Sequence, residues 1–277
     1  REAEIVATSV NTGEGLEELR DALARCLSAT APRPTGDLLR LPVDRVFTIK
    51  GFGTVVTGTL ASGEVSVGDE VEILPGGLPA TVRGIQVHGQ DTEAAHAGQR
   101  TALNLQGVPV EDLQRGNVLA RPGTLRAGQL VDARLQVLSG YGMEHLQRVR
   151  FHQGAAEVLA RVALLEGETI EGGADGLVQL RLESPHVVVP GDRFIVRRYS
   201  PLITIGGGVV LDVPDAKHRD RERAAAHLRR LESADLPRRL ALHVAAAGRR
   251  GRAAQELAVA LGMAPGAVRA GLEEARD

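Results

Sequence analysis

The chain has 277 residues, a formal net charge of −2 and a single cysteine, Cys26. This length accommodates two or three domains, and the lone cysteine excludes an intramolecular disulfide. The near-neutral charge alone predicts no polyanionic partner. Because no stretch resembles a signal peptide or an apolar run of about 18 residues, we expect a soluble protein of the cytoplasm.

The first part of the chain combines a patterned stretch with a linker-like stretch that follows it. The stretch "EIVATSVNTGEGLEELRDALARCL" contains a short apolar run, a glycine-containing polar loop, and then leucines at helical spacing from Leu16 to Leu27. This pattern predicts a strand, a loop and a helix. The next stretch, "SATAPRPTGD", is rich in Pro, Gly, Ser and Thr, as expected of a linker.

From residue 39 to about 123 the sequence is a series of short β-rich runs separated by turn signals. Such runs without a long intervening helix favour a small closed barrel. A second series, from about 128 to 213, predicts a second barrel of similar size. The runs of the first series are "RVFTI", "GTVVTGTL", "DEVEIL", "ATVRGIQV" and "RTALNLQG"; the second contains "LVDARLQVL", "RVRFHQG", "AEVLARVALL", "GLVQLRLE", "DRFIVRRY" and "GGGVVLDV".

The glycine-rich stretch "GFGTVVTG" is the first candidate for a nucleotide-binding loop. Its spacing does not fit one, because Gly53 is followed by Gly58, and no Gly-Lys-Ser/Thr tripeptide occurs anywhere in the chain. We instead expect Gly51 and Gly53 to form a tight bend between two strands, and Gly58 to mark a kink in a barrel strand.

Beyond Pro214 the pattern becomes helical. The stretch "DAKHRDRERAAAHLRRLESAD" predicts a charged helix, and from Lys217 to Arg252 there are eleven Lys or Arg residues against four Asp or Glu. The last stretch, "AAQELAVALGMAPGAVRAGLEEARD", predicts a helix-turn-helix with its turn at Gly262 and a second helix starting near Pro265. Since wing strands do not follow, we expect a partial winged helix and a fragment of a longer protein.

Two stretches carry a family resemblance. "PVDRVFTIKGFGTVVTGTLASGEVSVGDEVEIL" and "AGQRTALNLQGVPVEDLQRGNVLARPGTL" resemble domain II of the EF-Tu group of translational GTPases. The elements "VDR", "AGQR" and "RRYSPLITIGGG" resemble one branch in particular, the selenocysteine-specific elongation factors (SelB). The resemblance continues through the second β-rich region, which is similar to domain III, and into a C-terminal winged-helix segment.

The resemblance implies a mainly β fold of two consecutive barrels, with an N-terminal α/β remnant of the GTPase domain and a C-terminal helical segment. The implied domains are residues 1–30 (GTPase remnant), 38–124 (domain II), 126–213 (domain III) and 215–277 (linker helix and partial winged helix). Ser9, Val10 and Asn11 match the family motif whose backbone approaches the guanine base, with Val10 in place of the usual alanine. GTP and Mg are therefore implied for the full-length protein, although without P-loop or switch motifs this chain is not expected to hydrolyse GTP alone.

The resemblance also places selenocysteine-contacting positions on Asp44, Arg45 and Arg100. A selenol is more acidic than the cysteine thiol, whose pKa is about 8.5, so two guanidiniums would favour the selenolate over a serine hydroxyl. At about 1.5–3 kcal/mol for each charge-assisted hydrogen bond, two support discrimination of about a hundredfold or more. Two roles for Asp44 remain open, holding Arg45 or meeting the α-amino group. The alternative is an exposed Asp44–Arg45 ion pair, with Arg100 reflecting the general richness in arginine.

In the second barrel, the resemblance implies tRNA phosphate contacts for His152, Arg197 and Arg198. A buried or merely solvated His152 is the alternative. We expect no metal site, because His88 and His96 are too scattered and one cysteine forms no zinc cluster. Aromatic residues make up 2% of the chain, which disfavours base stacking and favours contact with RNA through charge and shape.

The implied function is delivery of selenocysteinyl-tRNA to the ribosome for incorporation at UGA, by a monomer without membrane contact. An mRNA selenocysteine-insertion hairpin would bind through further winged helices, so the helix-turn-helix here is expected to be a spacer. The alternatives are another aminoacyl-tRNA carrier of the EF-Tu group and a DNA-binding helix-turn-helix regulator without enzymatic activity. A hydrolase or transferase is disfavoured, since no nucleophile–base or metal motif occurs.

Overall fold

The computed structural model describes residues 4–30, 38–49 and 53–275, and the chain divides into two compact units, Arg1–Pro34 and Thr35–Asp277. The smaller unit contains helix α1 (Leu16–Ala29), which confirms the predicted helix. The strand predicted before it is wrong: residues 4–9 form no strand, and the side chain of Ile5 is 93% exposed. No strand of the described residues pairs with this apolar run, so its backbone lacks the ladder that a strand requires.

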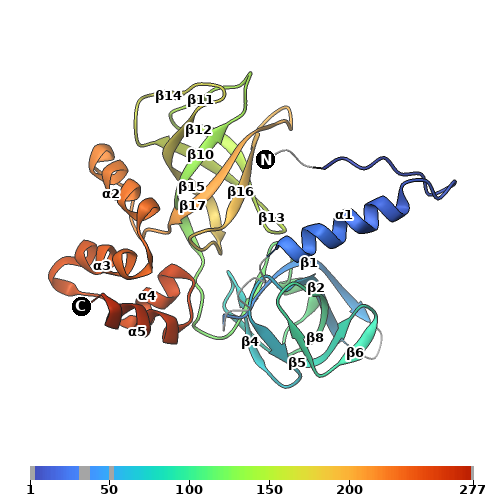
Figure 1. Cartoon of the computed structure of the whole chain (residues 1–277). Helices are drawn as coiled ribbons and strands as arrows, with labels where there is room; N and C mark the ends of the chain where they lie inside the picture. Colours follow the sequence, from blue (N-terminus) through green and yellow to red (C-terminus); the bar gives the residue numbers. More distant parts are fainter. Residues whose placement is uncertain (1–3, 31–37, 50–52, 276–277) are drawn as a thin grey trace. The chain divides into compact units, whose positions relative to one another are not determined.

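The first barrel contains six strands in the closed order β4-β9-β1-β2-β8-β5, with β6 (Gln90–Thr92) added at one edge (Figure 1). A small sheet of β3 (Glu64–Ser66) and β7 (Ala94–His96) and a 3₁₀ turn (Val110–Asp112) complete it. Val56, Ile73 and Leu103 are fully or almost fully buried in its core. The barrel strands are β1 (Arg40–Ile49), β2 (Gly53–Thr59), β4 (Glu70–Leu74), β5 (Leu78–Val87), β8 (Arg100–Gln106) and β9 (Val118–Ala120).

Gly58 lies at an irregularity in the β1–β2 pairing. The register changes between Val43 and Arg45, so that Asp44 has no partner in the ladder, and Gly58 is opposite Val43. A Cβ atom on Gly58 would lie 2.2 Å from the carbonyl oxygen of Pro42. This close approach of the two backbones confirms the kink expected at Gly58. Gly53 adopts a φ of +86°, whereas Gly51 lies outside the described residues.

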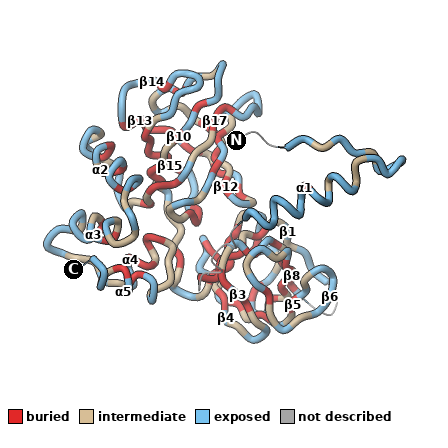
Figure 2. Tube along the Cα trace, in the orientation of Figure 1, coloured by how far each residue is buried: buried red, intermediate tan, exposed pale blue. Residues whose placement is uncertain are grey.

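The second barrel is closed in the order β10-β15-β13-β12-β16-β17, so the prediction of two barrels is confirmed. A two-stranded sheet of β11 (Met143–Glu144) and β14 (Thr169–Ile170) accompanies it. Phe151 and Phe194 meet in its core with ring centroids 5.2 Å apart. In both barrels some strands alternate buried with more exposed residues, as β8 and β12 do, whereas others such as β9 and β15 contain runs of buried residues (Figure 2). The strands are β10 (Gly128–Val137), β12 (Gln147–Gln153), β13 (Ala156–Leu164), β15 (Asp175–His186), β16 (Arg193–Arg198) and β17 (Thr204–Asp212).

A buried polar chain joins the two barrels. Arg40, the first residue of β1, donates to both carboxylate oxygens of Asp192 at 2.8 Å. Gln153 donates to the same carboxylate at 2.9 Å, and its amide oxygen lies 3.0 Å from Nε2 of His186. We call Arg40, Asp192, Gln153 and His186 the inter-barrel clasp. Each side chain of the clasp has at least one partner, which offsets much of the desolvation penalty, although Nε of Arg40 is buried without one.

Four helices follow the second barrel: α2 (Arg221–Ser233), α3 (Leu236–Ala247), α4 (Ala254–Leu261) and α5 (Pro265–Glu274). The predicted charged helix corresponds to α2, and the predicted helix-turn-helix corresponds to α4 and α5, with Gly262 in the left-handed conformation at the turn. The sequence pattern did not reveal α3 as a separate helix. Asp220 and Asp235 cap α2 and α3 by accepting backbone N–H bonds. The assignment to a winged helix stays a prediction, as do the domain limits.

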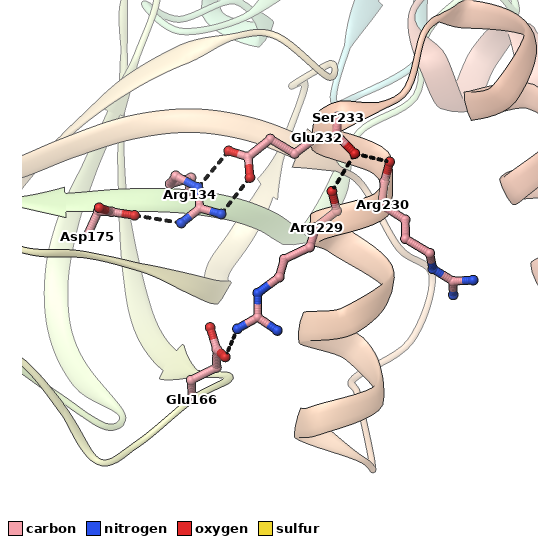
Figure 3. A network of polar contacts seen from close by, with 7 residues as sticks. All are labelled: Arg134, Glu166, Asp175, Arg229, Arg230, Glu232 and Ser233. Atoms are coloured by element: carbon pink, nitrogen blue, oxygen red, sulfur yellow. Dashed lines mark hydrogen bonds and ion pairs between the residues drawn. The ribbon is translucent and has the colours of Figure 1, made fainter.

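Ion pairs and apolar contacts fix α2 on the second barrel (Figure 3). Arg134 of β10 donates to both oxygens of Glu232 on α2 at 2.6 and 2.5 Å, and to Asp175 at 2.6 Å. Arg229 pairs with Glu166, while Leu228 packs into an apolar cluster with barrel residues. Part of the basic segment is therefore already paired within the chain and does not form a free cationic surface. Among the described residues, no helix is both long and apolar enough to cross a membrane.

Candidate functional site

The irregularity in β1 places two consecutive charged residues on the outside of the first barrel. Val43 belongs to the buried core and Val46 packs against that core. In a regular strand, side chains alternate between faces, so Asp44 and Arg45 would lie on opposite sides. The bulge interrupts this alternation: the Asp44 carboxylate contacts Thr57 and Arg100, and Arg45 is exposed on the strand next to Thr57.

Asp44 is held by two donors from neighbouring strands. Arg100 at the start of β8 makes a two-pronged ion pair with it, in which Nη2 donates to Oδ1 at 2.9 Å and Nη1 donates to Oδ2. Thr57 Oγ1 donates to Oδ1 at 2.9 Å. The hydrogen bond from Arg100 lowers the pKa of Asp44, and Asp44 in turn raises the pKa of Arg100. Both groups are therefore charged at neutral pH.

Arg45 contributes a second cation to this cluster. Within the described residues its guanidinium has no hydrogen-bonded or ion-paired partner, although its charge helps to lower the pKa of Asp44. The alternative, an ion pair between Asp44 and Arg45, is therefore wrong, because the ion-pair partner of Asp44 is Arg100. Two guanidiniums against one carboxylate leave one positive charge in excess. This geometry suits a small anion bound at the surface.

A cavity of about 470 Å³ lies on the same outer face of the first barrel. Its walls include Val55, which is two residues from Thr57 on β2, and Ala102 and Asn104, which are two and four residues from Arg100 on β8. Because alternate residues of a strand share one face, the cavity and the charged cluster form one continuous surface. The other lining residues are Ile49, Val67, Arg83, Gly84, Ile85, Gln86, Asp91, Thr92 and Glu93.

Sequence reasoning missed Thr57 and the cavity. Thr57 is opposite Arg45 in the β1–β2 hairpin and opposite Ala102 in the β2–β8 pair. Assigning the pairing register of the β1–β2 hairpin from the sequence would have placed Thr57 beside Arg45. The cavity had no such signal, since residues of five strands line it, β1, β2, β5, β6 and β8, and their arrangement depends on pairing between segments far apart in the sequence.

Of the three residues predicted to contact tRNA, His152 and Arg197 lie near each other on paired strands, and the charge of Arg197 helps to lower the pKa of His152, whereas Arg198 faces Tyr141. His152 lies on β12, with Nε2 3.7 Å from a Glu157 carboxylate oxygen, and burial lowers its pKa. Arg197 donates to the carbonyl of Leu202 at 2.5 Å, while the guanidinium of Arg198 stands 5.8 Å from the Tyr141 ring centroid. The two guanidiniums therefore have different neighbours, Leu202 for Arg197 and Tyr141 for Arg198. Their contact with tRNA stays a prediction.

The proposed guanine-contacting loop is a tight turn before α1. The N–H of Gly13 donates to the carbonyl of Ser9 at 2.9 Å, and the N–H of Ser9 donates to the carbonyl of Glu14 at 3.0 Å. The side chain of Val10 is 86% exposed, and Asn11 is exposed as well. The backbone amides of Val10 and Asn11 make no hydrogen bond within the described residues, so they fit contact with a base edge. For a metal, the described ranges offer no group of three or more His, Cys, Asp or Glu residues.

Comparison with known proteins agrees with this architecture. Residues 53–120 match the model of elongation factor Tu domain 2, and residues 131–217 match the model "Selenocysteine-specific elongation factor, beta-barrel domain". The selenocysteine-specific elongation factor of Desulfomicrobium baculatum is 43% identical over 259 residues, which is 93% of this chain and 41% of that protein. The chain belongs to the selenocysteine-specific elongation factor family. The family member of Escherichia coli K12 is 34% identical over 80% of this chain and 34% of its own length.

Solved structures of the selenocysteine-specific elongation factor family share the fold. A crystal structure of a bacterial selenocysteine-specific elongation factor matches 95% of this chain and 42% of its own with a TM-score of 0.82 and 25% identity. The apo factor of Methanococcus maripaludis matches 76% of this chain and 50% of its own with a TM-score of 0.64 and 27% identity. The chain thus spans about two fifths of the length of the first curated relative.

Proposed function

We propose that this chain is the tRNA-carrying part of a translation elongation factor that delivers selenocysteinyl-tRNA to the ribosome. The observation that carries the proposal is the outer face of the first barrel, where Arg45 and Arg100 lie beside a cavity of about 470 Å³. A selenolate is an anion at neutral pH and a serine hydroxyl is not, so an excess of guanidinium charge favours the former. Family membership supports the same substrate.

The cavity offers a binding site for the tRNA nucleoside to which the amino acid is attached. In aminoacyl-tRNA the amino acid is esterified to the terminal nucleoside, so a receptor needs an anion site and a nucleoside site within one ester linkage of each other. The walls supply apolar surface from Val55 and Ile85, and Gln86 and Asn104 supply amide groups for a base or ribose. We assign this cavity to the terminal nucleoside and the Arg45–Arg100 cluster to the selenolate.

Asp44 acts in this proposal as a positioning residue for Arg100. Its carboxylate accepts from Nη1 and Nη2 of Arg100 and from Thr57 Oγ1, which fixes the plane of the guanidinium before any ligand arrives. The remaining N–H groups of Arg100 and all those of Arg45 are available to a ligand. Preorganised donors lose less side-chain entropy on binding than free ones.

The other proposed partners act through other parts of the protein. His152, Arg197 and Arg198 of the second barrel contact tRNA phosphates, and an mRNA hairpin binds through winged helices. GTP and Mg function in the full-length protein, where the loop of Ser9, Val10 and Asn11 meets the guanine base. We propose that the protein is a monomer located in the cytoplasm. No relative reported above is a DNA-binding regulator or a carrier of ordinary aminoacyl-tRNA.

The test compares binding of selenocysteinyl-tRNA and seryl-tRNA that share one tRNA body. We expect the chain to prefer the selenocysteinyl form, and expect Arg45→Ala and Arg100→Ala each to reduce that preference at least about tenfold, because each removes one charge-assisted hydrogen bond. Affinity is measured by fluorescence anisotropy of labelled tRNA under reducing conditions.

Arg121→Ala is the matched control. Arg121 also pairs with an aspartate, Asp69, on the first barrel, and the exposure of that pair (41% and 24%) is close to that of Arg100 and Asp44 (49% and 28%). We expect this variant to keep the preference. If tRNA binds but ignores both the amino acid and the two substitutions, the anion site is refuted and only a general tRNA-binding barrel remains.

A further inference from the structure

We propose that a second, cationic cavity, which adjoins the connection between the two barrels, binds a phosphate group. The cavity has a volume of about 410 Å³ and lies beside the second barrel. Three segments form it: the connection between the barrels at Arg126, strand β15 at Arg181, and the segment leading to α2 at Lys217. None of these residues belongs to the proposed aminoacyl site, so the inference stands independently of the proposed function.

Positive charge in this cavity exceeds negative charge. Arg126, Arg181 and Lys217 line it together with one carboxylate, Asp215. That carboxylate is already engaged, since Arg126 pairs with it and Arg252 lies 3.5 Å from it. Within the described residues, neither Arg181 nor Lys217 has a hydrogen-bonded or ion-paired acceptor, and Nε of Arg181 is buried without a partner. Such guanidiniums normally find an acceptor.

A like-charge pair adjoins the cavity. In the β13–β15 ladder Arg181 is directly opposite Arg161, and like charges at such positions are destabilising. In the part of the chain that the structure describes, the hydrogen bond of Arg161 goes to the carbonyl of Leu146, at 3.3 Å. The nearest acidic residue along β15, Glu183, is held by Arg148 through two bonds of 2.7 and 2.6 Å. The charge of Arg161 also helps to lower the pKa of Glu183, but among the described residues no carboxylate forms a hydrogen bond or ion pair with Arg161 or Arg181. A bound anion would therefore reduce the repulsion.

The segment that presents Lys217 is fixed rather than free. Its neighbour His218 lies 2.6 Å from the buried carboxylate of Asp132, which also accepts from Gln179 at 3.1 Å. The backbone of Val213 accepts a hydrogen bond from Arg126 at 2.9 Å. Planar guanidiniums and an ammonium around one space match the tetrahedral, multiply charged phosphate group. The volume exceeds that of one phosphate, which favours a diphosphate or a nucleic-acid backbone.

The first experiment measures thermal unfolding of the whole chain with increasing pyrophosphate. We expect pyrophosphate to raise the midpoint, since a ligand that binds only the folded state stabilises it. Arg181→Gln and Lys217→Gln should each weaken binding at least about tenfold. Without pyrophosphate, Arg181→Gln should unfold at the same temperature as the wild type or higher, because it removes the repulsion with Arg161; a role in packing alone would lower it.

Arg193→Gln is the control, because Arg193 is an exposed arginine of the same barrel on a different strand, β16. It should respond to pyrophosphate as the wild type does. A parallel titration with a 12-base-pair RNA duplex, followed by anisotropy, distinguishes a free diphosphate from a nucleic-acid backbone. If Arg181→Gln weakens the binding of either ligand, the phosphate site is supported, and the ligand affected identifies the source of the phosphate. Equal responses of wild type, Arg181→Gln and Arg193→Gln in both titrations would overturn the inference and leave the aminoacyl site untouched.

Discussion

Two arginine–aspartate pairs involve the same strand, β1, and differ mainly in burial. Arg40, at the start of the strand, pairs with Asp192 of the second barrel, and these side chains are 9% and 13% exposed. Asp44, four residues later, pairs with Arg100 within the first barrel, and these side chains are 28% and 49% exposed. The chemistry is the same in both pairs, so burial decides what each can do.

The buried pair has no access for a ligand, because Arg40, Gln153 and the N–H of Val189 already surround the Asp192 carboxylate. The exposed pair keeps guanidinium N–H groups at the surface beside a cavity. The first therefore contributes to structure, and the second suits binding. Variants that break each pair test this distinction.

The largest effect is expected from Arg40→Gln. Removing one partner of a buried pair leaves an uncompensated charge, which costs on the order of 3–5 kcal/mol of unfolding free energy. Urea denaturation followed by circular dichroism measures it. The double variant Arg40→Met with Asp192→Leu should recover part of the loss, because no buried charge then remains unpaired, while the amide of Gln153 and the N–H of Val189 lose their acceptor. A single variant as stable as the wild type would show that the clasp is not structural.

An intermediate effect is expected from His186, the last member of the clasp. Burial and the charge of Arg40 lower the pKa of His186 to about 4, below its ordinary value of 6.5. Between these values the unfolded chain binds the proton and the folded chain does not, so stability falls as the pH decreases through this window. The contribution is on the order of 1–2 kcal/mol between pH 6.5 and 5.

His186→Gln tests this pH dependence, since glutamine keeps a polar group near Gln153 but does not titrate. Urea denaturation of both proteins at pH 6.5 and 5 should give a smaller decrease in unfolding free energy for the variant. The comparison cancels other titrating groups, including His152, His227 and His243, whose pKa values are also lowered by burial. Equal decreases would mean that His186 is protonated equally in both states.

Much of the fold could be predicted from local pattern. Strand alternation identified both barrels, leucine spacing identified α1, and Gly262 with Pro265 identified the last helix-turn-helix. These signals depend on neighbours close in sequence. The strand predicted near residues 4–9 is absent from the structure, which shows the limit of prediction from local pattern, since a strand also needs a neighbouring strand that pairs with it.

The site could be predicted only in part, because its geometry depends on contacts between distant strands. A family motif singled out Asp44, Arg45 and Arg100, yet the pairing of Asp44 with Arg100 spans 56 positions. The bulge that brings Asp44 and Arg45 to one face is a property of the β1–β2 register. Arg40 and Asp192 carried no signal at all, since an arginine in an arginine-rich chain is unremarkable until its burial is known.

The smallest effect on stability is expected from Asp44→Asn. Arg100 lowers the pKa of Asp44, so the ion pair contributes stability above the unfolded value of about 3.8 and loses it only as the pH falls through the lower folded value. At neutral pH an exposed pair of this kind contributes less than about 1 kcal/mol. Urea denaturation should therefore hardly distinguish the variant from the wild type, whereas the selenocysteinyl preference should fall because Arg100 loses its restraint. A stability loss as large as that of Arg40→Gln would contradict the distinction, since Asp44 would then hold the barrel together rather than orient a group that binds.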